Sequence, residues 1–181
     1  MSDERVFQVR RVDLSFLDEA KVRYDNTVEL DCTPADLFAI FADERSWPVW
    51  APGFKHIEWT SPRPFRVGTT RTATLMFGLK IHEVFLAWED GARMAFIFTG
   101  SNRNLSTSLE ALIEDYRVED LGDGRCRLTW TLAYNSAGFM RHFAALGKPF
   151  VNFFLKRILG GLRRYVRKGE YTRALPAPAE A

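Results

Sequence analysis

The chain has 181 residues and a net charge of +2, a length that fits one domain with a single core. Apolar residues make up 46% and aromatic residues 14%, which excludes a disordered chain, and no stretch reaches the roughly 18 apolar residues of a membrane span. The 15 Phe and 5 Trp fit either a solid aromatic core or a cavity with aromatic walls, and composition alone leaves both open.

Three segments are expected along the chain. Residues 1–20 form an N-terminal lead-in whose structure the pattern leaves open, and they carry no apolar signal segment. Residues 21–169 form the folded domain, which has no internal repeat and no linker to divide it. Residues 170–181 are rich in Ala and Pro and are expected to form a disordered tail.

The domain begins with a strand and two short helices. Residues 22–32 alternate between apolar and polar side chains, which is the period of a strand with one buried face. Thr33 and Pro34 then supply a capping hydroxyl and a proline at the first helical position, and Asp36 places a carboxylate in the first turn. A second short helix is expected over residues 44–50.

Six further strands are expected after these helices, separated by turns that contain Pro or Gly. Their ranges are about 54–60, 66–77, 79–89, 92–100, 105–120 and 125–135. Together with residues 22–32 they give a seven-stranded antiparallel sheet.

The hydrophobic pattern predicts the register of the last hairpin. A three-residue loop at 122–124 places apolar side chains of both strands on one face, whereas a two-residue turn would bury charges there. The expected cross-strand pairs are Leu128 with Val118, Trp130 with Tyr116, Tyr134 with Leu112 and Arg127 with Glu119.

The same argument, applied to a turn at Gly78 and Leu79, puts Arg71 and His82 together on an apolar face. A change of one residue in the length of this loop would reverse the assignment. The same face would also carry Thr69, Ala73, Leu75, Phe77, Val84, Leu86 and Trp88.

A long helix is expected over residues 139–168, with a bend near 147–149 because Pro149 cannot donate the backbone hydrogen bond. Its apolar residues recur at steps of three or four, as one helix face requires: Phe143, Leu146, Phe150, Phe154, Ile158, Leu162 and Tyr165. The helix has eight basic residues and no acidic one, and residues 139–181 carry +7 against −5 for residues 1–138. This basic face is either plain solvated surface or a contact for anionic membrane or an acidic partner. No aromatic residues interleave with the basic ones on that face, so nucleic acid is not expected.

Three motifs stand in this order of elements: Asp43-Glu-Arg-Ser-Trp47-Pro48-Val49-Trp50-Ala-Pro-Gly53, Gly124-Arg-Cys-Arg-Leu-Thr-Trp130-Thr-Leu and Leu162-Arg-Arg-Tyr165-Val. In these motifs and their order, residues 20–168 resemble the polyketide cyclase/dehydrase and lipid-transfer branch of the START-like superfamily, also called SRPBCC or helix-grip. The resemblance implies an α+β fold, in which a curved antiparallel sheet wraps around the long C-terminal helix. It also implies an apolar cavity between sheet and helix, and it carries over no catalytic residues.

We expect a ligand site in that cavity. The candidate ligand-binding residues are those turned inward by the registers above, with two tryptophans at the mouth: Trp47, Trp50, Arg71, Leu75, Phe77, His82, Leu86, Tyr116, Trp130, Tyr134, Phe143, Phe150 and Phe154. Arg71 either binds a ligand carboxylate from an inward position or is an outward surface arginine. Trp47 and Trp50 either gate the pocket or fill the core at the end of the sheet. Tyr116, Trp130 and Tyr134 offer polar tips either to a ligand or to backbone partners.

Neither a catalytic nor a metal-binding pattern accompanies these residues. His56, His82 and His142 lack the spacing of metal ligands, and the chain has no complete dinucleotide fingerprint, so we expect no metal and no cofactor. Cys32 and Cys126 lack a Cys-x-x-Cys pattern, so we expect two buried free thiols and a cytoplasmic location.

Three classes of function remain open from the sequence. The first is binding of a small hydrophobic ligand, a lipid or a polyketide-like aromatic molecule, in the cavity. The second is a cyclase or dehydratase that uses the same cavity, with Arg71, Tyr134 or His82 as polar catalysts. The third is an interaction module that binds a membrane or a protein through the basic helix. The sequence leaves the oligomeric state open.

Overall fold

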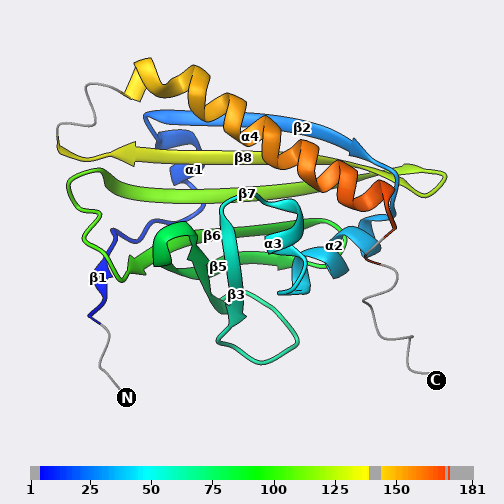
Figure 1. Cartoon of the computed structure of the whole chain (residues 1–181), viewed down its shortest axis with the longest axis horizontal. Coiled ribbons are helices and arrows are strands. Elements are labelled where there is room, and N and C mark those ends of the chain that lie inside the picture. Colours follow the sequence, from blue (N-terminus) through cyan, green and yellow to red (C-terminus); the bar gives the residue numbers. More distant parts are fainter. Residues whose placement is uncertain (1–4, 139–143, 170, 172–181) are drawn as a thin grey trace.

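The computed structural model describes residues 5–138, 144–169 and 171. Within them the elements are β1 (Phe7–Gln8), α1 (Phe16–Glu19), β2 (Val22–Leu30), α2 (Pro34–Ala42), α3 (Trp47–Trp50), β3 (Phe54–Trp59), β4 (Thr70–Leu75), β5 (Lys80–Glu89), β6 (Arg93–Ser101), β7 (Leu109–Gly122), β8 (Arg125–Ser136) and α4 (Ala144–Arg167). A short 3₁₀ turn, Met76–Gly78, lies between β4 and β5. The predicted α+β fold is confirmed, with two short helices after the first long strand and a long C-terminal helix (Figure 1).

The sheet of the described residues has eight strands, all paired antiparallel. Its main path runs β2-β8-β7-β6-β5-β4-β3, and these are the seven strands expected from the sequence, while β1 adds a short pairing to β6. We call the face of the curved sheet on which α4 lies the concave face, and the opposite face the convex face. The main core fills the concave face between the sheet and the helices α2, α3 and α4.

Local chemistry explains the start of α2. The Thr33 hydroxyl accepts a hydrogen bond from the Asp36 backbone N–H at 3.1 Å, and an Asp36 carboxylate oxygen accepts one from the Thr33 N–H at 3.2 Å. This reciprocal pair satisfies donors that a helix N-terminus leaves open, and Pro34 at the first helical position has no N–H to lose. The predicted helix start is therefore confirmed.

The predicted register of the last hairpin is also confirmed. Val118 pairs with Leu128 and Tyr116 with Trp130, and Arg127 donates to Glu119 at 2.8 Å. The loop itself is shorter than expected: Gly122 pairs with Arg125, which leaves a two-residue turn, and the extra residue lies in an irregularity of β7 between Asp120 and Gly122. The irregularity shifts β7 by one residue and so keeps the apolar side chains on one face.

The predicted register of the β4–β5 hairpin is wrong. Thr72 pairs with His82 and Arg71 with Glu83, so Arg71 and His82 point to opposite faces. The reason is the turn: β4 ends at Leu75, the chain passes through the 3₁₀ segment, and Leu75 N donates to Leu79 O at 2.7 Å. The longer loop changes the pairing by an odd number of residues, which exchanges the two faces of the partner strand.

Residues before β2 cover the convex face. Phe16 and Leu17 of α1 are buried against Ile97 and Ile113, in a second apolar cluster separate from the main core. These residues therefore pack on the sheet, which the sequence left open. The expected tail at 170–181 lies outside the described residues, apart from Tyr171.

Helix α4 packs its C-terminal half on the sheet. The buried residues are Leu155, Ile158, Leu159, Leu162, Tyr165 and Val166. Phe150 and Phe154 were expected on this face, but their side chains are 75% and 41% exposed. The helix runs through Pro149 as one element, and the bend expected there stays a prediction, while the start of the helix at 139–143 lies outside the described residues.

Candidate functional site

The end of the concave face beside α2 and α3 is closed by aromatic packing. Trp47 and Trp50 are buried, with ring centroids 4.6 Å apart, and the Trp47 indole N–H donates to the Phe41 carbonyl at 2.9 Å. The Phe41 ring in turn meets Tyr116 edge to face at 5.5 Å. Both tryptophans therefore occupy the core position that the sequence offered as the alternative to a gate.

Arg71 points inward into this closed end, where its positive charge is paired with a carboxylate of the protein itself. Its side chain is fully buried and pairs through Nε with the Glu83 carboxylate, which is 2% exposed. Its guanidinium carbon lies 4.3 to 5.4 Å from the ring centroids of Trp47, Phe96, Phe85 and Trp59. Four aromatic faces around a cation provide favourable cation–π contacts. No described residue accepts a hydrogen bond from Nη1 or Nη2.

Glu114 is the inward carboxyl next to this closed end. It lies on β7 between Phe96 on β6 and Leu132 on β8. One of its oxygens, Oε2, accepts hydrogen bonds from the Tyr116 hydroxyl at 2.7 Å and the Trp130 indole N–H at 2.9 Å. No described residue donates to the other oxygen, Oε1.

Burial raises the pKa of Glu114 from 4.5 to about 7. The hydrogen bonds from Tyr116 and Trp130 act in the opposite direction, and the nearby Glu83 carboxylate adds to the increase. Burial also raises the pKa of Glu83, although Arg71 opposes that effect. A carboxyl with a pKa near 7 carries a proton part of the time at neutral pH, so it can donate or accept a hydrogen bond or a proton.

The concave face is more open on the side of Glu114 away from α2 and α3. On the three central strands Met94, Phe96, Tyr116 and Trp130 are buried, whereas the inward residues beyond them are half-buried. These half-buried residues are Phe98, Leu112, Glu114, Leu132 and Tyr134. An apolar surface with one carboxyl and the Tyr116 and Tyr134 rings at its edge is the arrangement expected of a site for a hydrophobic ligand with one polar group.

The structure divides the predicted ligand residues. Six of them contribute to the concave face or its core: Trp47, Trp50, Arg71, Tyr116, Trp130 and Tyr134. Leu75 is half-buried at the end of β4, opposite Phe54. Phe154 is partly exposed on α4, and Phe143 lies outside the described residues.

Four predicted ligand residues are placed elsewhere, which corrects the sequence analysis. His82 lies on the other face from Arg71 and contacts the Thr72 hydroxyl through Nδ1 at 3.1 Å. Leu86 packs with the convex cluster. Phe77 is 83% exposed in the turn after β4, with a φ of 60°, and Phe150 is exposed on α4. The first three follow from the longer β4–β5 turn, and Phe150 from the way α4 packs.

Glu114 and Glu83 were not identified from the sequence. For Glu114 a signal was present, because the predicted hairpin register already turned Leu112, Tyr116 and Val118 inward, and Glu114 shares their parity. A charged residue at an inward position of an otherwise apolar strand face is a site candidate. Glu83 could not be found this way, since the predicted register of its hairpin placed Glu83 on the face opposite to that of Arg71.

Three further properties bear on the chemistry of the described residues. None of the helices within them combines the length and the apolar character needed to cross a bilayer. No group of three or more His, Cys, Asp or Glu among them is placed to hold a metal ion. Cys32 and Cys126 are buried free thiols with their Sγ atoms 4.0 Å apart, as predicted, while the cytoplasmic location stays a prediction.

Comparisons with known proteins agree with this architecture. The family described as polyketide cyclase / dehydrase and lipid transport matches residues 21–167. Uncharacterized proteins of Mycobacterium bovis and Mycobacterium tuberculosis are 42% identical over 160 residues, which cover 88% of this chain and 93% of each relative.

Solved structures with little sequence identity share the fold. A START superfamily protein from Mycobacterium smegmatis has a TM-score of 0.63 at 12% identity, with 81% of this chain and 97% of that one covered. The di-domain ARO/CYC BexL from the BE-7585A biosynthetic pathway has a TM-score of 0.65 at 12% identity, with 81% of this chain and 46% of that one covered.

Proposed function

The chain belongs to the polyketide cyclase / dehydrase and lipid transport family, and from this premise we propose that it binds a small hydrophobic molecule that carries a hydroxyl group. The ligand would be a polyketide-like phenol or a lipid alcohol, held on the open part of the concave face. The observation that carries the proposal is the Glu114 carboxyl, fixed through one oxygen by Tyr116 and Trp130 and bordered by half-buried apolar residues.

The charges around the site favour a neutral ligand over a carboxylate. Arg71, the residue expected from the sequence to receive a ligand carboxylate, is paired with Glu83 and enclosed by aromatic rings. The polar group next to the open surface is instead Glu114, and an ionised ligand acid would be repelled by Glu114 in its ionised form. A hydroxyl can donate to Oε1 when Glu114 is ionised and accept from it when Glu114 is protonated.

A matched pair of aromatic probes tests this proposal. We expect 2-naphthol to bind at least about tenfold more tightly than 2-naphthoate near pH 7, with quenching of the tryptophan fluorescence as the readout. Glu114→Leu should abolish this preference, because it removes both the hydrogen bond to the alcohol and the repulsion of the acid. Glu119→Gln is the matched control, since Glu119 lies on the same strand but is exposed and bonded to Arg127. Equal binding of the two probes by the unaltered protein would exclude Glu114 from the site.

A cyclase or dehydratase is the second candidate, favoured by the pKa of about 7 at Glu114, which suits general acid–base catalysis near neutral pH. In an enzyme, Glu114→Gln should abolish turnover of a reactive polyketone while ground-state affinity for the probe changes little. In a carrier, the unaltered protein should leave the polyketone at its rate of spontaneous cyclisation. Product analysis by mass spectrometry separates the two.

Peripheral contact with an anionic membrane is a further candidate, favoured by the exposed side of α4. Phe150 and Phe153 are 75% and 65% exposed, and Arg157 follows one turn later on the same side of the helix. Exposed aromatic and basic side chains together suit a membrane interface. Phe150→Ser/Phe153→Ser should reduce cosedimentation with vesicles that contain phosphatidylglycerol. If the unaltered protein fails to sediment with them at low salt, α4 has no membrane role.

A further inference from the structure

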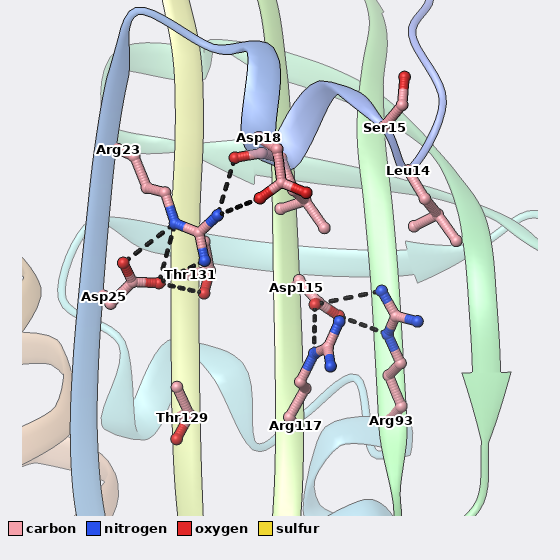
Figure 2. Close-up of a pocket in the computed structure, with 11 residues that line it drawn as sticks. Leu14, Ser15, Asp18, Arg23, Asp25, Arg93, Asp115, Arg117, Thr129 and Thr131 are labelled. Carbon is pink, nitrogen blue, oxygen red and sulfur yellow. Dashed lines mark hydrogen bonds and ion pairs between the residues drawn. The ribbon is translucent and has the colours of Figure 1, made fainter.

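The convex face carries a hollow that the ligand site on the other side of the sheet does not use. It lies between α1 and the sheet, has a volume of about 540 Å³ and extends over β2, β8, β7 and β6 (Figure 2). The wall at α1 is partly apolar, with Leu14 and Leu17, and the floor has the hydroxyls of Thr129 and Thr131. Six of the remaining lining residues are charged and lie in two groups, as Figure 2 shows.

The group on β6 and β7 has two arginines and one buried carboxylate. Arg93 and Arg117 are directly opposite each other in the antiparallel pair, where like charges repel. Asp115, 2% exposed, accepts from Arg93 Nε at 2.8 Å, Arg93 Nη2 at 3.2 Å and Arg117 Nε at 2.8 Å. One carboxylate offsets only one of the two positive charges, so this group has a formal charge of +1.

Several N–H donors of this group have no acceptor. No described residue accepts from Arg93 Nη1 or from Arg117 Nη1 and Nη2. Arg23 on β2 differs, because it donates to Asp25, Asp18 and the Leu17 carbonyl at 2.9 to 3.2 Å. The two arginines beside Asp115 are therefore oriented by that carboxylate while their outer nitrogens stay available.

We propose that the hollow binds a small molecule through an oxyanion, a phosphate or carboxylate group, held by Arg93 and Arg117. Guanidinium groups offer paired donors that match such an oxyanion, and Asp115 fixes the direction of both forks before the ligand arrives. The opposite group, Arg23 with Asp18 and Asp25, has a formal charge of −1. The far end of the ligand should therefore carry a hydroxyl or an amine rather than a second anion.

Titration with inorganic phosphate and with acetate tests the proposal. The NMR signals of the arginine Nε–H groups and of the β7 backbone amides are the readout. We expect saturable shifts at Arg93, Arg117 and Asp115, with a dissociation constant on the order of millimolar that weakens as salt rises. Tighter binding of phosphate would identify a phosphate ester as the ligand class, and tighter binding of acetate a carboxylate.

Three variants give the controls. Arg117→Gln should weaken phosphate binding about tenfold, and Arg117→Lys should restore only part of it, because lysine keeps the charge but lacks the fork. Arg127→Gln should leave binding unchanged, since Arg127 lies on the same face of β8 but outside the hollow, bonded to Glu29 and Glu119. No saturable shift up to about 50 mM phosphate, or an equal loss in Arg127→Gln, would overturn the proposal.

Discussion

The two ends of the concave face use similar side chains for different purposes. Beside α2 and α3 the rings of Trp47, Phe85 and Phe96 surround the Arg71–Glu83 pair, and water is excluded. One step further along the same strands, Glu114 faces a surface on which apolar residues are only half-buried. Aromatic residues thus stabilise the fold at one end and border the proposed ligand site at the other. The difference between the two ends is that Arg71 is enclosed with a fixed opposite charge, whereas Glu114 has no paired cation among the described residues and borders half-buried residues.

The largest expected effect tests whether the closed end is structural. Arg71→Met leaves the Glu83 carboxylate buried without its partner, which should lower the free energy of unfolding by about 3–5 kcal/mol. The double variant Arg71→Met/Glu83→Leu should recover most of this loss, because it removes both charges. Urea denaturation of the three proteins gives the values. A loss of less than about 1 kcal/mol in the single variant would contradict the closed-end assignment.

The next prediction concerns Glu114 at the open end. Its pKa in the fold, about 7, lies above the ordinary 4.5, so the folded state holds the proton more tightly than the unfolded state. This contribution is fully present below about pH 4.5 and is lost as the pH rises through about 7, on the order of 3 kcal/mol in total. Glu114→Gln should remove that part of the pH dependence of stability, measured by urea denaturation between pH 5 and pH 8. An unchanged slope would place the carboxyl in solvent.

A third test addresses how α3 closes its end of the face. A Cβ added at Gly161 of α4 would lie 2.1 Å from the Trp50 carbonyl oxygen, so the two helices touch through backbone there. Gly161→Ala should therefore cost about 1–3 kcal/mol. Gly160→Ala is the matched control, since its nearest neighbour is the Arg164 Nη1 at 3.8 Å, and it should be neutral or stabilise by up to about 1 kcal/mol. Equal changes in melting temperature in the two variants would show that the close contact at Gly161 does not cause the loss of stability.

The smallest effect is expected at a surface ion pair, which is the exposed counterpart of the buried pair of Arg71 and Glu83. Arg167 and Asp31 are 3.4 Å apart and both more than half exposed. Arg167→Gln should change the free energy of unfolding by less than about 1 kcal/mol, and still less at high salt. A larger loss would mean that the basic face of α4 contributes to the stability of the fold, and not only to the charge of the protein surface.

Part of the candidate site could be predicted from the sequence. The inward direction of Tyr116, Trp130 and Tyr134 follows from a hairpin whose register the alternating pattern defines, because a slip by one residue would bury charge. The inward direction of Arg71 agrees with one of the two alternatives, yet its partner Glu83 was not predicted, because the pairing of β4 with β5 depends on a turn that no local pattern specifies.

The order of the elements, the capped start of α2, the register of the last hairpin and the family resemblance could all be predicted from the sequence. Each of these depends on neighbouring residues, through a period of 2 or 3.6 or through the residue types that caps and turns require. Three features depend on tertiary packing instead: Phe150 is exposed while Leu155 is buried, Arg71 is enclosed, and burial raises the pKa of Glu114 to about 7. Burial and pKa depend on which segments, distant in the chain, cover a side chain, and the local pattern contains no information on that covering.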